Sequence, residues 1–373
     1  MDRRNFVKTI SAVTATAIIP NQTFGKSQAS VLDLSSIRKD MLKHCEAILD
    51  KNGPYGSYRS GLGKRPDLYS SCDVAIMRTI MGEDLMITLT HEQRKQWIDH
   101  INSFANHFHG KPTDGSYGDI FGHSVHHANG MVIGALGVLG GKQKYPVKLY
   151  EEFSSVDKIF PWLEKIDWVN QWTASHLFWG GMHCYSMSAK CSDLWKETVF
   201  NWLNNNIDEQ SGWWKKGVPH ADRHQPLGGS VHILPLYQHL NREFPVPEKV
   251  IDSVLDLQLS NGLWLLKPNL INVMTYLELD ALYALKYMST LVPNYRADEI
   301  LQAVNRHADC VISYLKLNSK NLLTLHPHRT LSAIGALGLL QQFYPNRFVD
   351  DVQWTDIFSD VRFYQTSKVE VFQ

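Results

Sequence analysis

The spacing of hydrophobic residues is helical along the whole chain from residue 31 onward, and no run alternates between apolar and polar positions as a half-buried strand would. Twelve helical segments can be distinguished, and they alternate in character along the chain. The first segment of each pair has one apolar face, which is typical of a helix that covers a core. The second is apolar around most of its surface, which is typical of a buried helix. This alternation predicts six helical hairpins.

The amphipathic segments, which we expect to form an outer layer, cover residues 34–50, 90–109, 146–164, 192–206, 247–259 and 297–316. The apolar segments, which we expect to form an inner layer, cover residues 68–82, 125–140, 172–188, 228–241, 273–289 and 328–343. Six such hairpins predict an all-α (α/α)6 toroid with an inner and an outer ring of helices. No segment rich in Pro, Gly or Ser divides the chain, so residues 30–373 are expected to form one domain.

Two recurring patterns support a repeated unit. The segment IGALGVL at 133–139 recurs as IGALGLL at 334–340, an offset of 201 residues or four hairpins of roughly fifty residues each. In this register His127 and His328 occupy equivalent positions. The second pattern, a glycine followed by one residue and a large aromatic residue, begins at Gly56, Gly115, Gly212 and Gly262.

The last of these turns belongs to a longer motif, Gln258-x-x-x-Gly262-x-Trp264. It resembles the Q-x-x-x-G-x-W motif of terpenoid cyclases and prenyltransferases, which have the (α/α)6 architecture. The resemblance implies the fold but not the activity, because the sequence contains neither D-x-D-D nor D-D-x-x-D. The other large group with this fold consists of polysaccharide lyases and glycoside hydrolases. The chain resembles this group as an expected exported toroid, and the resemblance implies action on a saccharide.

The first 29 residues resemble a bacterial export signal. Arg3-Arg4, with Phe6 and Lys8 after them, resembles the twin-arginine (Tat) motif, and an apolar stretch and a small-residue cleavage site follow. This pattern predicts a periplasmic or secreted protein. The formal net charge is zero, and −3 without these residues, which gives no basic surface for nucleic acid. No apolar run is long enough to span a membrane, and the oligomeric state cannot be inferred.

Most candidate chemical groups lie at the starts of the apolar segments, which a toroid would gather at one mouth. Histidine is the most frequent of them. Elimination across a uronic acid requires a base, an acid and a group that neutralises the carboxylate. The candidates for acid and base are His127, His176 and His224, together with Tyr69, Tyr117 or Tyr185. The candidates for binding the anionic substrate are Asn129, Arg223, His328 and Arg329.

A glycoside hydrolase would instead need two carboxyl groups that face one bond. Asp73 and Asp280 are the best-placed pair because they lie within apolar segments, and Asp119 and Asp222 lie in expected loops. Trp172, Trp213 and Trp214 are expected to stack on sugar rings, because Trp offers a flat apolar face.

A metal site is a weaker third hypothesis. Among His123, His126, His127, His176 and His183, only His123 and His127 have the i, i+4 spacing of a helical zinc site. We therefore predict no cofactor. The sequence favours an exported enzyme that cleaves an acidic saccharide, with a lyase ahead of a hydrolase. A terpenoid-cyclase-like enzyme and a non-catalytic binding toroid remain as alternatives.

Overall fold

The computed structural model describes residues 30–108, 111–118, 123–264 and 273–364. The predicted export signal, residues 1–29, and the loop residue Asp119 lie outside these ranges. In the described part the protein is predominantly helical, so the prediction of an all-α protein is confirmed.

Six helices correspond to the predicted outer segments, and each buries one face. They are α1 (Leu34–Ile48), α4 (His91–Asn102), α6 (Val156–Glu164), α9 (Asp193–Asn205), α12 (Pro247–Leu257) and α14 (Ala297–Asn318). The predicted inner segments correspond to continuous helices in four cases, and nearly every residue of these helices is buried. They are α2 (Leu68–Ile80), α5 (Val125–Val138), α13 (Tyr276–Leu291) and α15 (Pro327–Phe343).

The other two inner segments are interrupted. Residues 171–186 form α7 (Gln171–Ala174), the π-helix η3 (Phe178–His183) and α8 (Cys184–Ser186). Residues 225–239 form α10 (Gln225–Ser230) and α11 (Leu234–His239). Pro235 explains the second break, because it has no N–H to donate to the carbonyl of Val231 in a continuous helix. The prediction of unbroken helices at 172–188 and 228–241 was therefore wrong.

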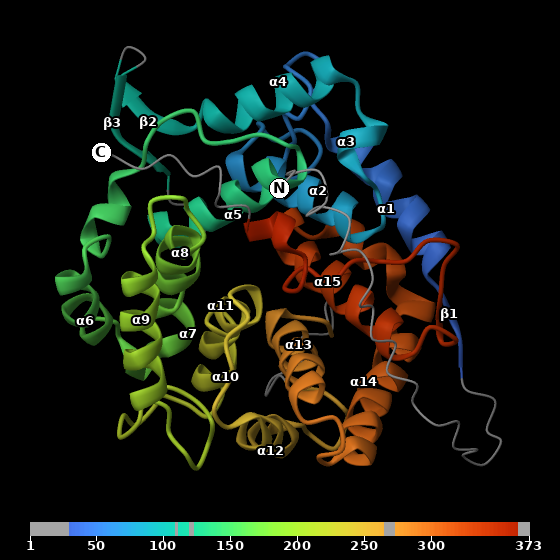
Figure 1. Ribbon diagram of the computed structural model, residues 1–373. Helices are drawn as coiled ribbons and strands as arrows, with labels where there is room; N and C mark the ends of the chain where they lie inside the picture. Colours follow the sequence, from blue (N-terminus) through green and yellow to red (C-terminus); the bar gives the residue numbers. More distant parts are fainter. Residues whose placement is uncertain (1–29, 109–110, 119–122, 265–272, 365–373) are drawn as a thin grey trace, which may run out of the picture. The chain divides into compact units, whose positions relative to one another are not determined.

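The inner segments pack against one another in the order of the chain (Figure 1). Helix α2 contacts α5, α5 contacts η3, and α7 contacts α10. Helix α10 in turn contacts α13, α13 contacts α15, and α15 contacts α2. These contacts form a closed circuit, so the last inner helix lies beside the first.

Strands occur where helix or loop was expected. The predicted outer helix at 90–109 ends at Asn102, and β2 (Ala105–Phe108) pairs antiparallel with β3 (Lys111–Tyr117). A helix through this region is disfavoured by Pro112 and Gly115. The other short elements are the parallel pair β1 (Leu32–Asp33) and β4 (Phe348–Val349), α3 (Leu85–Thr88), and the 3₁₀ helices η1 (Lys148–Glu152), η2 (Trp168–Asn170), η4 (Ser319–Thr324) and η5 (Val361–Tyr364).

The repeated glycine turns share one conformation and one packing role. Gly56, Gly115, Gly212 and Gly262 all have positive φ, between 69° and 95°. At each of them an added Cβ would collide with the beginning or body of the next outer element. The collision would be with the Trp97 ring of α4, the carbonyl of Pro146 before η1, Val250 of α12, and the carbonyl of Arg306 in α14, respectively. Glycine is therefore required both by the backbone angle and by the close approach.

The aromatic residue two positions after each glycine is buried. Tyr58, Tyr117, Trp214 and Trp264 are at most 2% exposed. The indole N–H of Trp214 donates to the carbonyl of Leu203 at 2.8 Å, and that of Trp264 donates to Val254 at 2.9 Å. Each indole thus anchors its turn to the outer helix that precedes it, while the glycine contacts the outer helix that follows.

The Gln258 motif is part of the same connection. The amide of Gln258 donates to the carbonyls of Gly262 at 3.1 Å and of Ala303, in α14, at 2.8 Å. The Trp264 ring packs on His307, also in α14, with ring centres 5.4 Å apart. These contacts account for the motif as a structural link between α12 and α14.

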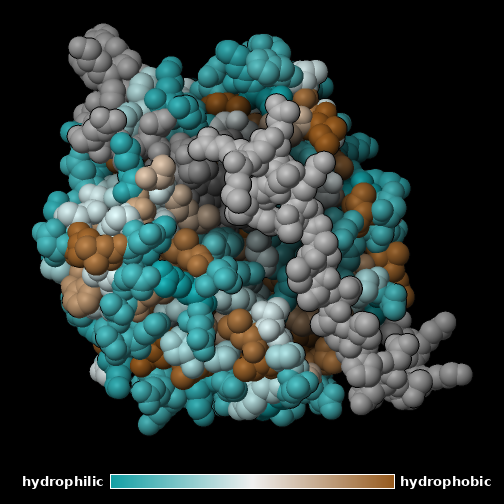
Figure 2. All heavy atoms as spheres, viewed as in Figure 1, coloured by the Kyte–Doolittle hydropathy of each residue, from teal (hydrophilic) through white to brown (hydrophobic). Residues whose placement is uncertain are grey.

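Among the described helices, none combines the length and the apolar character needed to cross a bilayer. On the face shown in Figure 2, hydrophilic residues predominate and hydrophobic ones form small separate groups.

Replacing Gly262 with Ala should destabilise the protein more than the same change at Gly63. Both glycines have positive φ, which costs about 1–2 kcal/mol for a residue with a Cβ. Gly63 has open space around it, whereas a Cβ on Gly262 would lie 2.6 Å from the carbonyl oxygen of Arg306. We expect this clash to add about 1–3 kcal/mol, as over-packing does. Urea unfolding of both variants measures the difference, and equal losses would contradict the packing role.

Stability should fall as the pH is lowered, and His307 should account for part of the loss. Burial lowers the pKa of His307 to about 4, although a hydrogen bond with the carbonyl of Gly262 opposes the shift. In the unfolded chain the pKa is near 6.5, so between these values the unfolded state binds more protons. We expect His307 to cost about 1–2 kcal/mol of stability between about pH 7 and about pH 5.

His307→Asn keeps a donor near the position of Nδ1 but does not titrate in this range. Urea unfolding at a series of pH values should give a flatter dependence for His307→Asn than for the unaltered protein, whatever its stability at neutral pH. His91→Asn, at an exposed position, is the control and should leave the dependence unchanged. An unchanged slope in His307→Asn would refute the assignment.

Candidate functional site

Five histidine side chains meet where several inner segments come together. His127 and His328 lie in the first turns of α5 and α15, and His123 lies two residues before α5. His176 lies between α7 and η3, and His232 lies between α10 and α11. We call these five residues the histidine cluster. The sequence analysis named four of them, His123, His127, His176 and His328, and the structure brings these together with His232.

The rings of the histidine cluster are close enough to touch. The ring centre of His127 lies 4.1 Å from that of His123 and 4.4 Å from that of His176. The ring of His328 is 5.4 Å from both His123 and His127. His232 lies 5.1 Å from His176 and is hydrogen-bonded through Nδ1 to Oγ of Ser175 at 2.7 Å.

Side-chain caps set the helix starts that carry two of these rings. Ser124 caps α5 by accepting a hydrogen bond from the backbone N–H of His127 at 3.3 Å. His326 caps α15 by accepting one from the N–H of His328 at 3.0 Å. The two helices therefore begin at corresponding points of the repeat, which explains why residues 201 positions apart reach one site.

Glycines bring the π-helix close to α5. A Cβ on Gly180 would lie 1.6 Å from the carbonyl oxygen of His126, so only glycine fits. The approach places Trp179 against the cluster, with its ring centre 5.2 Å from that of His127. π-Helical turns of this kind often occur at functional sites.

Helix α2 supplies two polar partners from one face. Tyr69 and Asp73 are four residues apart, so they project side by side from α2. The hydroxyl of Tyr69 is hydrogen-bonded to Nδ1 of His127 at 2.7 Å. Oδ1 of Asp73 is hydrogen-bonded to Nδ1 of His328 at 3.1 Å. Both α2 side chains are fully buried, so their orientation is fixed by the core.

The surroundings favour neutral imidazoles. Burial lowers the pKa of His127 and of His176 well below the usual value, and the neighbouring histidines lower both further. The same two effects lower the pKa of His232 to about 3. Burial also raises the pKa of Asp73, although His328 opposes this shift.

Two buried polar atoms beside the cluster have no hydrogen-bond partner among the described residues. They are Nδ1 of His176 and Oδ2 of Asp73. Buried polar atoms normally find a partner, so each of these atoms can accept one from water, an ion or a substrate. Neutral imidazoles can accept a proton or bind a metal ion, and the phenol of Tyr69 can donate a proton.

Four of the other predicted catalytic residues do not join the cluster. The hydroxyl of Tyr117 donates to Asn102, and that of Tyr185 lies against the carbonyl of Ser154. His224 is buried beside Asp222, with 3.7 Å between Nδ1 and a carboxylate oxygen. Asp280 is buried in α13, and burial followed by the charge of Glu278 raises its pKa well above the usual value.

Of the predicted substrate-binding residues, His328 belongs to the cluster, whereas the others are dispersed. Asn129 is fully buried and its amide is engaged by Tyr150, the carbonyl of Gly180 and Gln143, so it cannot neutralise a substrate carboxylate. Arg223 is exposed and donates to the carbonyl of Asp256. Arg329 is exposed beside His328 at the start of α15.

The expected sugar-stacking tryptophans have different positions from those predicted. Trp213 and Trp214 are only 2% and 0% exposed, so their faces are not available to a sugar, and that expectation was wrong. Their burial follows from the repeated turn, in which the aromatic residue anchors the outer helix. Trp172 is half-buried and covers Gly228 of α10.

The sequence interpretation missed Tyr276 and Ser175. The hydroxyl of Tyr276 donates to the carbonyl of His328 at 2.7 Å, and its ring lies 5.5 Å from that of His328. Tyr276 opens α13 just as His127 and His328 stand in the first turns of their helices, so the repeat register could have identified it. Ser175 could not be found in this way, because it depends on the break between α7 and η3.

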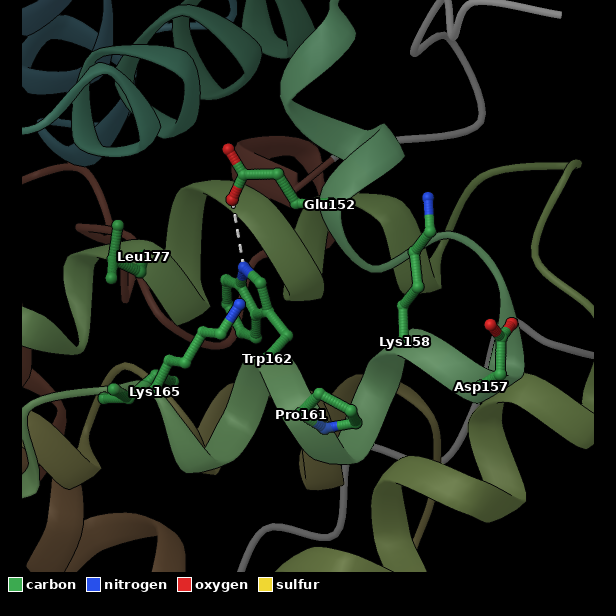
Figure 3. A pocket seen from close by; sticks show the side chains of 8 residues that line it. Glu152, Asp157, Lys158, Pro161, Trp162, Lys165 and Leu177 are labelled. Carbon is green, nitrogen blue, oxygen red and sulfur yellow. Dashed lines mark hydrogen bonds between the residues drawn. The ribbon is translucent and has the colours of Figure 1, made fainter.

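The structure also has a cavity that the histidine cluster does not line. It has a volume of about 680 Å³ and is lined by both acidic and basic side chains around Trp162, whose indole donates to Glu152 at 3.0 Å (Figure 3). None of its lining residues belongs to the histidine cluster. Its polar groups are mainly flexible surface side chains, so we place the candidate chemistry at the cluster.

Comparison with known proteins does not supply a function. The chain matches no protein-family model, no curated protein and no solved structure. The interpretation of the histidine cluster therefore rests on its own geometry.

Proposed function

We propose that the protein is an (α/α)6 toroid that cleaves an acidic saccharide by β-elimination at the histidine cluster. The closed circuit of inner segments, with an outer helix for each, supports the toroid. The convergence of proton-transferring side chains at the starts of the inner helices supports an enzyme, because groups with strongly shifted pKa values concentrate at catalytic sites.

The observation that carries the proposal is the arrangement of Tyr69, His127 and His176. Tyr69 is hydrogen-bonded to His127 at 2.7 Å, and His127 lies against His176 with ring centres 4.4 Å apart. A phenol and a neutral imidazole are thus held in one buried site. Elimination needs this combination of a proton donor and a proton acceptor on the two sides of the bond that breaks.

In the proposed reaction, Nδ1 of His176 takes the proton from the carbon next to the uronate carboxylate. The electron pair of the broken C–H bond forms the carbon–carbon double bond, and the glycosidic C–O bond breaks. Tyr69 gives its proton to the departing oxygen, and proton exchange between His176, the solvent and Tyr69 restores the starting state. His127 orients the Tyr69 hydroxyl through their hydrogen bond.

Hydrolysis by two carboxyl groups is less well supported. Asp73 is directed to His328, at 3.1 Å, so one oxygen of this carboxyl group is already committed. The raised pKa of Asp280 suits a general acid, but among the described residues Asp280 makes no hydrogen bond with the histidine cluster. The proposal also includes export of the protein to the periplasm or beyond, for which the Arg3-Arg4 segment is the support.

The purified protein should release unsaturated products from one or more uronic-acid polysaccharides. We would measure the ultraviolet absorbance of the unsaturated uronate together with new reducing ends. Tyr69→Phe should reduce the rate by about 10²–10⁴-fold, because it removes the proton donor and leaves the ring in place. His176→Gln should reduce it to a similar extent.

Tyr344→Phe is a control, because it also removes a hydrogen-bonded phenolic hydroxyl, here a partly buried one that donates to the carbonyl of Leu301 at 2.6 Å. Tyr344 follows the far end of α15, about 24 Å along the helix from His328. This variant should keep full activity. Reducing ends without ultraviolet absorbance would exclude elimination and favour hydrolysis, and equal losses in Tyr69→Phe and Tyr344→Phe would refute the role of Tyr69.

A further inference from the structure

We propose that His123, His127 and His328 form a binding site for one divalent transition-metal ion, with Asp73 and Tyr69 as positioning residues. This site goes beyond the proposed elimination and is tested without it. The three residues come from two regions of the chain about 200 positions apart, so the site exists only in the folded protein.

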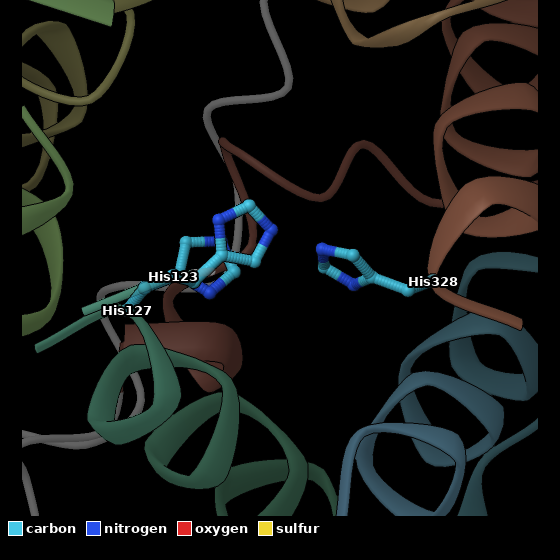
Figure 4. Close-up of side chains that lie close together, drawn as sticks. All are labelled: His123, His127 and His328. Carbon is cyan, nitrogen blue, oxygen red and sulfur yellow. The ribbon is translucent and has the colours of Figure 1, made fainter. Parts of the chain in front are cut away.

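The geometry of the three side chains is close to that of a metal site. One nitrogen from each ring can be chosen so that all three lie within 4.8 Å of one another. Figure 4 shows His328 pointing toward His123 and His127 from the opposite side. Tetrahedral zinc with Zn–N distances of 2.0–2.1 Å would bring the nitrogens to about 3.3 Å apart. Metal binding would therefore require the three nitrogens to move closer together than the 4.8 Å limit within which they lie.

The outer contacts provide an independent argument. A histidine that binds a metal usually donates its other ring N–H to a carboxylate or another acceptor, which fixes the ring. Nδ1 of His328 meets the carboxylate of Asp73, and Nδ1 of His127 meets the hydroxyl of Tyr69. Both contacts place Nε2 on the other side of the ring, where the metal would bind. Asp73 is completely buried, so this carboxylate is held in place by the core.

The donor set defines the class of metal. Three imidazole nitrogens suit Zn²⁺, Co²⁺, Ni²⁺ or Cu²⁺, whereas Mg²⁺ and Ca²⁺ prefer oxygen ligands. Three protein ligands also leave a coordination position open for water or substrate, as catalytic zinc sites do. We therefore infer a site with an open position, in contrast to a four-ligand structural site.

The site would add what the proposed elimination lacks. Neutral imidazoles cannot neutralise a uronate carboxylate, and Asn129, which was predicted to contribute, is engaged elsewhere. At its open coordination position, a bound metal ion would bind the uronate carboxylate and stabilise the negative charge that develops next to it. With His127 bound through Nε2, its Nδ1–H donates to the Tyr69 oxygen, and the phenolic proton remains directed to the leaving group. This role rests on the proposed function, but metal binding itself does not.

Metal binding to the full-length protein tests the site directly. After removal of metal with a chelator, titration with Zn²⁺ followed by calorimetry should show one equivalent bound. Titration with Co²⁺ should produce visible absorption typical of nitrogen ligands in a four-coordinate site. His123→Ala and His328→Ala should each weaken binding by more than about 100-fold, and Asp73→Asn should weaken it by about 10–100-fold.

His220→Ala is the matched control, because His220 lies on another loop and is hydrogen-bonded through Nδ1 to the carbonyl of Trp168. It should bind zinc as the unaltered protein does. Circular dichroism and urea unfolding identify any variant that fails to fold, and zinc added to the folded ones should raise the unfolding midpoint only where the site is intact.

Two outcomes would overturn the site: no stoichiometric zinc binding by the unaltered protein, or equal binding by His220→Ala and both ligand variants. These results are distinct from a failure of the proposed function. Zinc binding without any activity on saccharides would support the site and refute the elimination. Full activity in the metal-stripped protein would support the elimination and refute the catalytic role of the metal.

Discussion

The close approach of each glycine turn to the next outer helix is the constraint on which the rest of the structure depends. At Gly56, Gly115, Gly212 and Gly262 the backbone adopts positive φ and leaves no room for a Cβ. The aromatic residue that follows is buried against the preceding outer helix. One turn therefore fixes two neighbouring outer helices, and the inner segment after it begins at a defined place. Such turns precede α2, α5, α10 and α13, so they help to set where the segments that carry Tyr69, His127 and His232 begin.

The histidine cluster has the opposite physical character from the core around it. A core of apolar side chains gains stability by burial, whereas buried imidazoles lose hydration and must remain neutral. The hydrogen bonds that these imidazoles form with Tyr69, Asp73 and Ser175 offset part of this cost. Nδ1 of His176 and Oδ2 of Asp73 receive no such compensation from the described residues. Such a site is typical of a protein that sacrifices some stability for a function.

The sequence predicted the parts of this structure that depend on local pattern. Hydrophobic periodicity located the helices, and the repeat register related His127 to His328. The pattern could not show the break at Ser175, because this break depends on how closely neighbouring helices pack. The break near Val231 was readable in the sequence as Pro235, but hydrophobic periodicity alone does not register a missing N–H. The pattern also could not show depth. A turn aromatic such as Trp214 has the same local sequence whether it faces a sugar or the core, and Asn129 lies one turn too deep for its predicted role.

The contact between α15 and α2 has a consequence for synthesis of the chain. Helix α2 is buried around nearly its whole surface, yet one of its principal neighbours begins about 250 residues later. At ribosomal rates of about 5–20 residues per second, this neighbour appears roughly 10–50 s after α2 has been made. During that interval α2 exposes a surface that would bind other apolar chains. The circuit of inner segments therefore closes only when the last inner helix has reached the first, so the full protection of α2 comes at the end of synthesis.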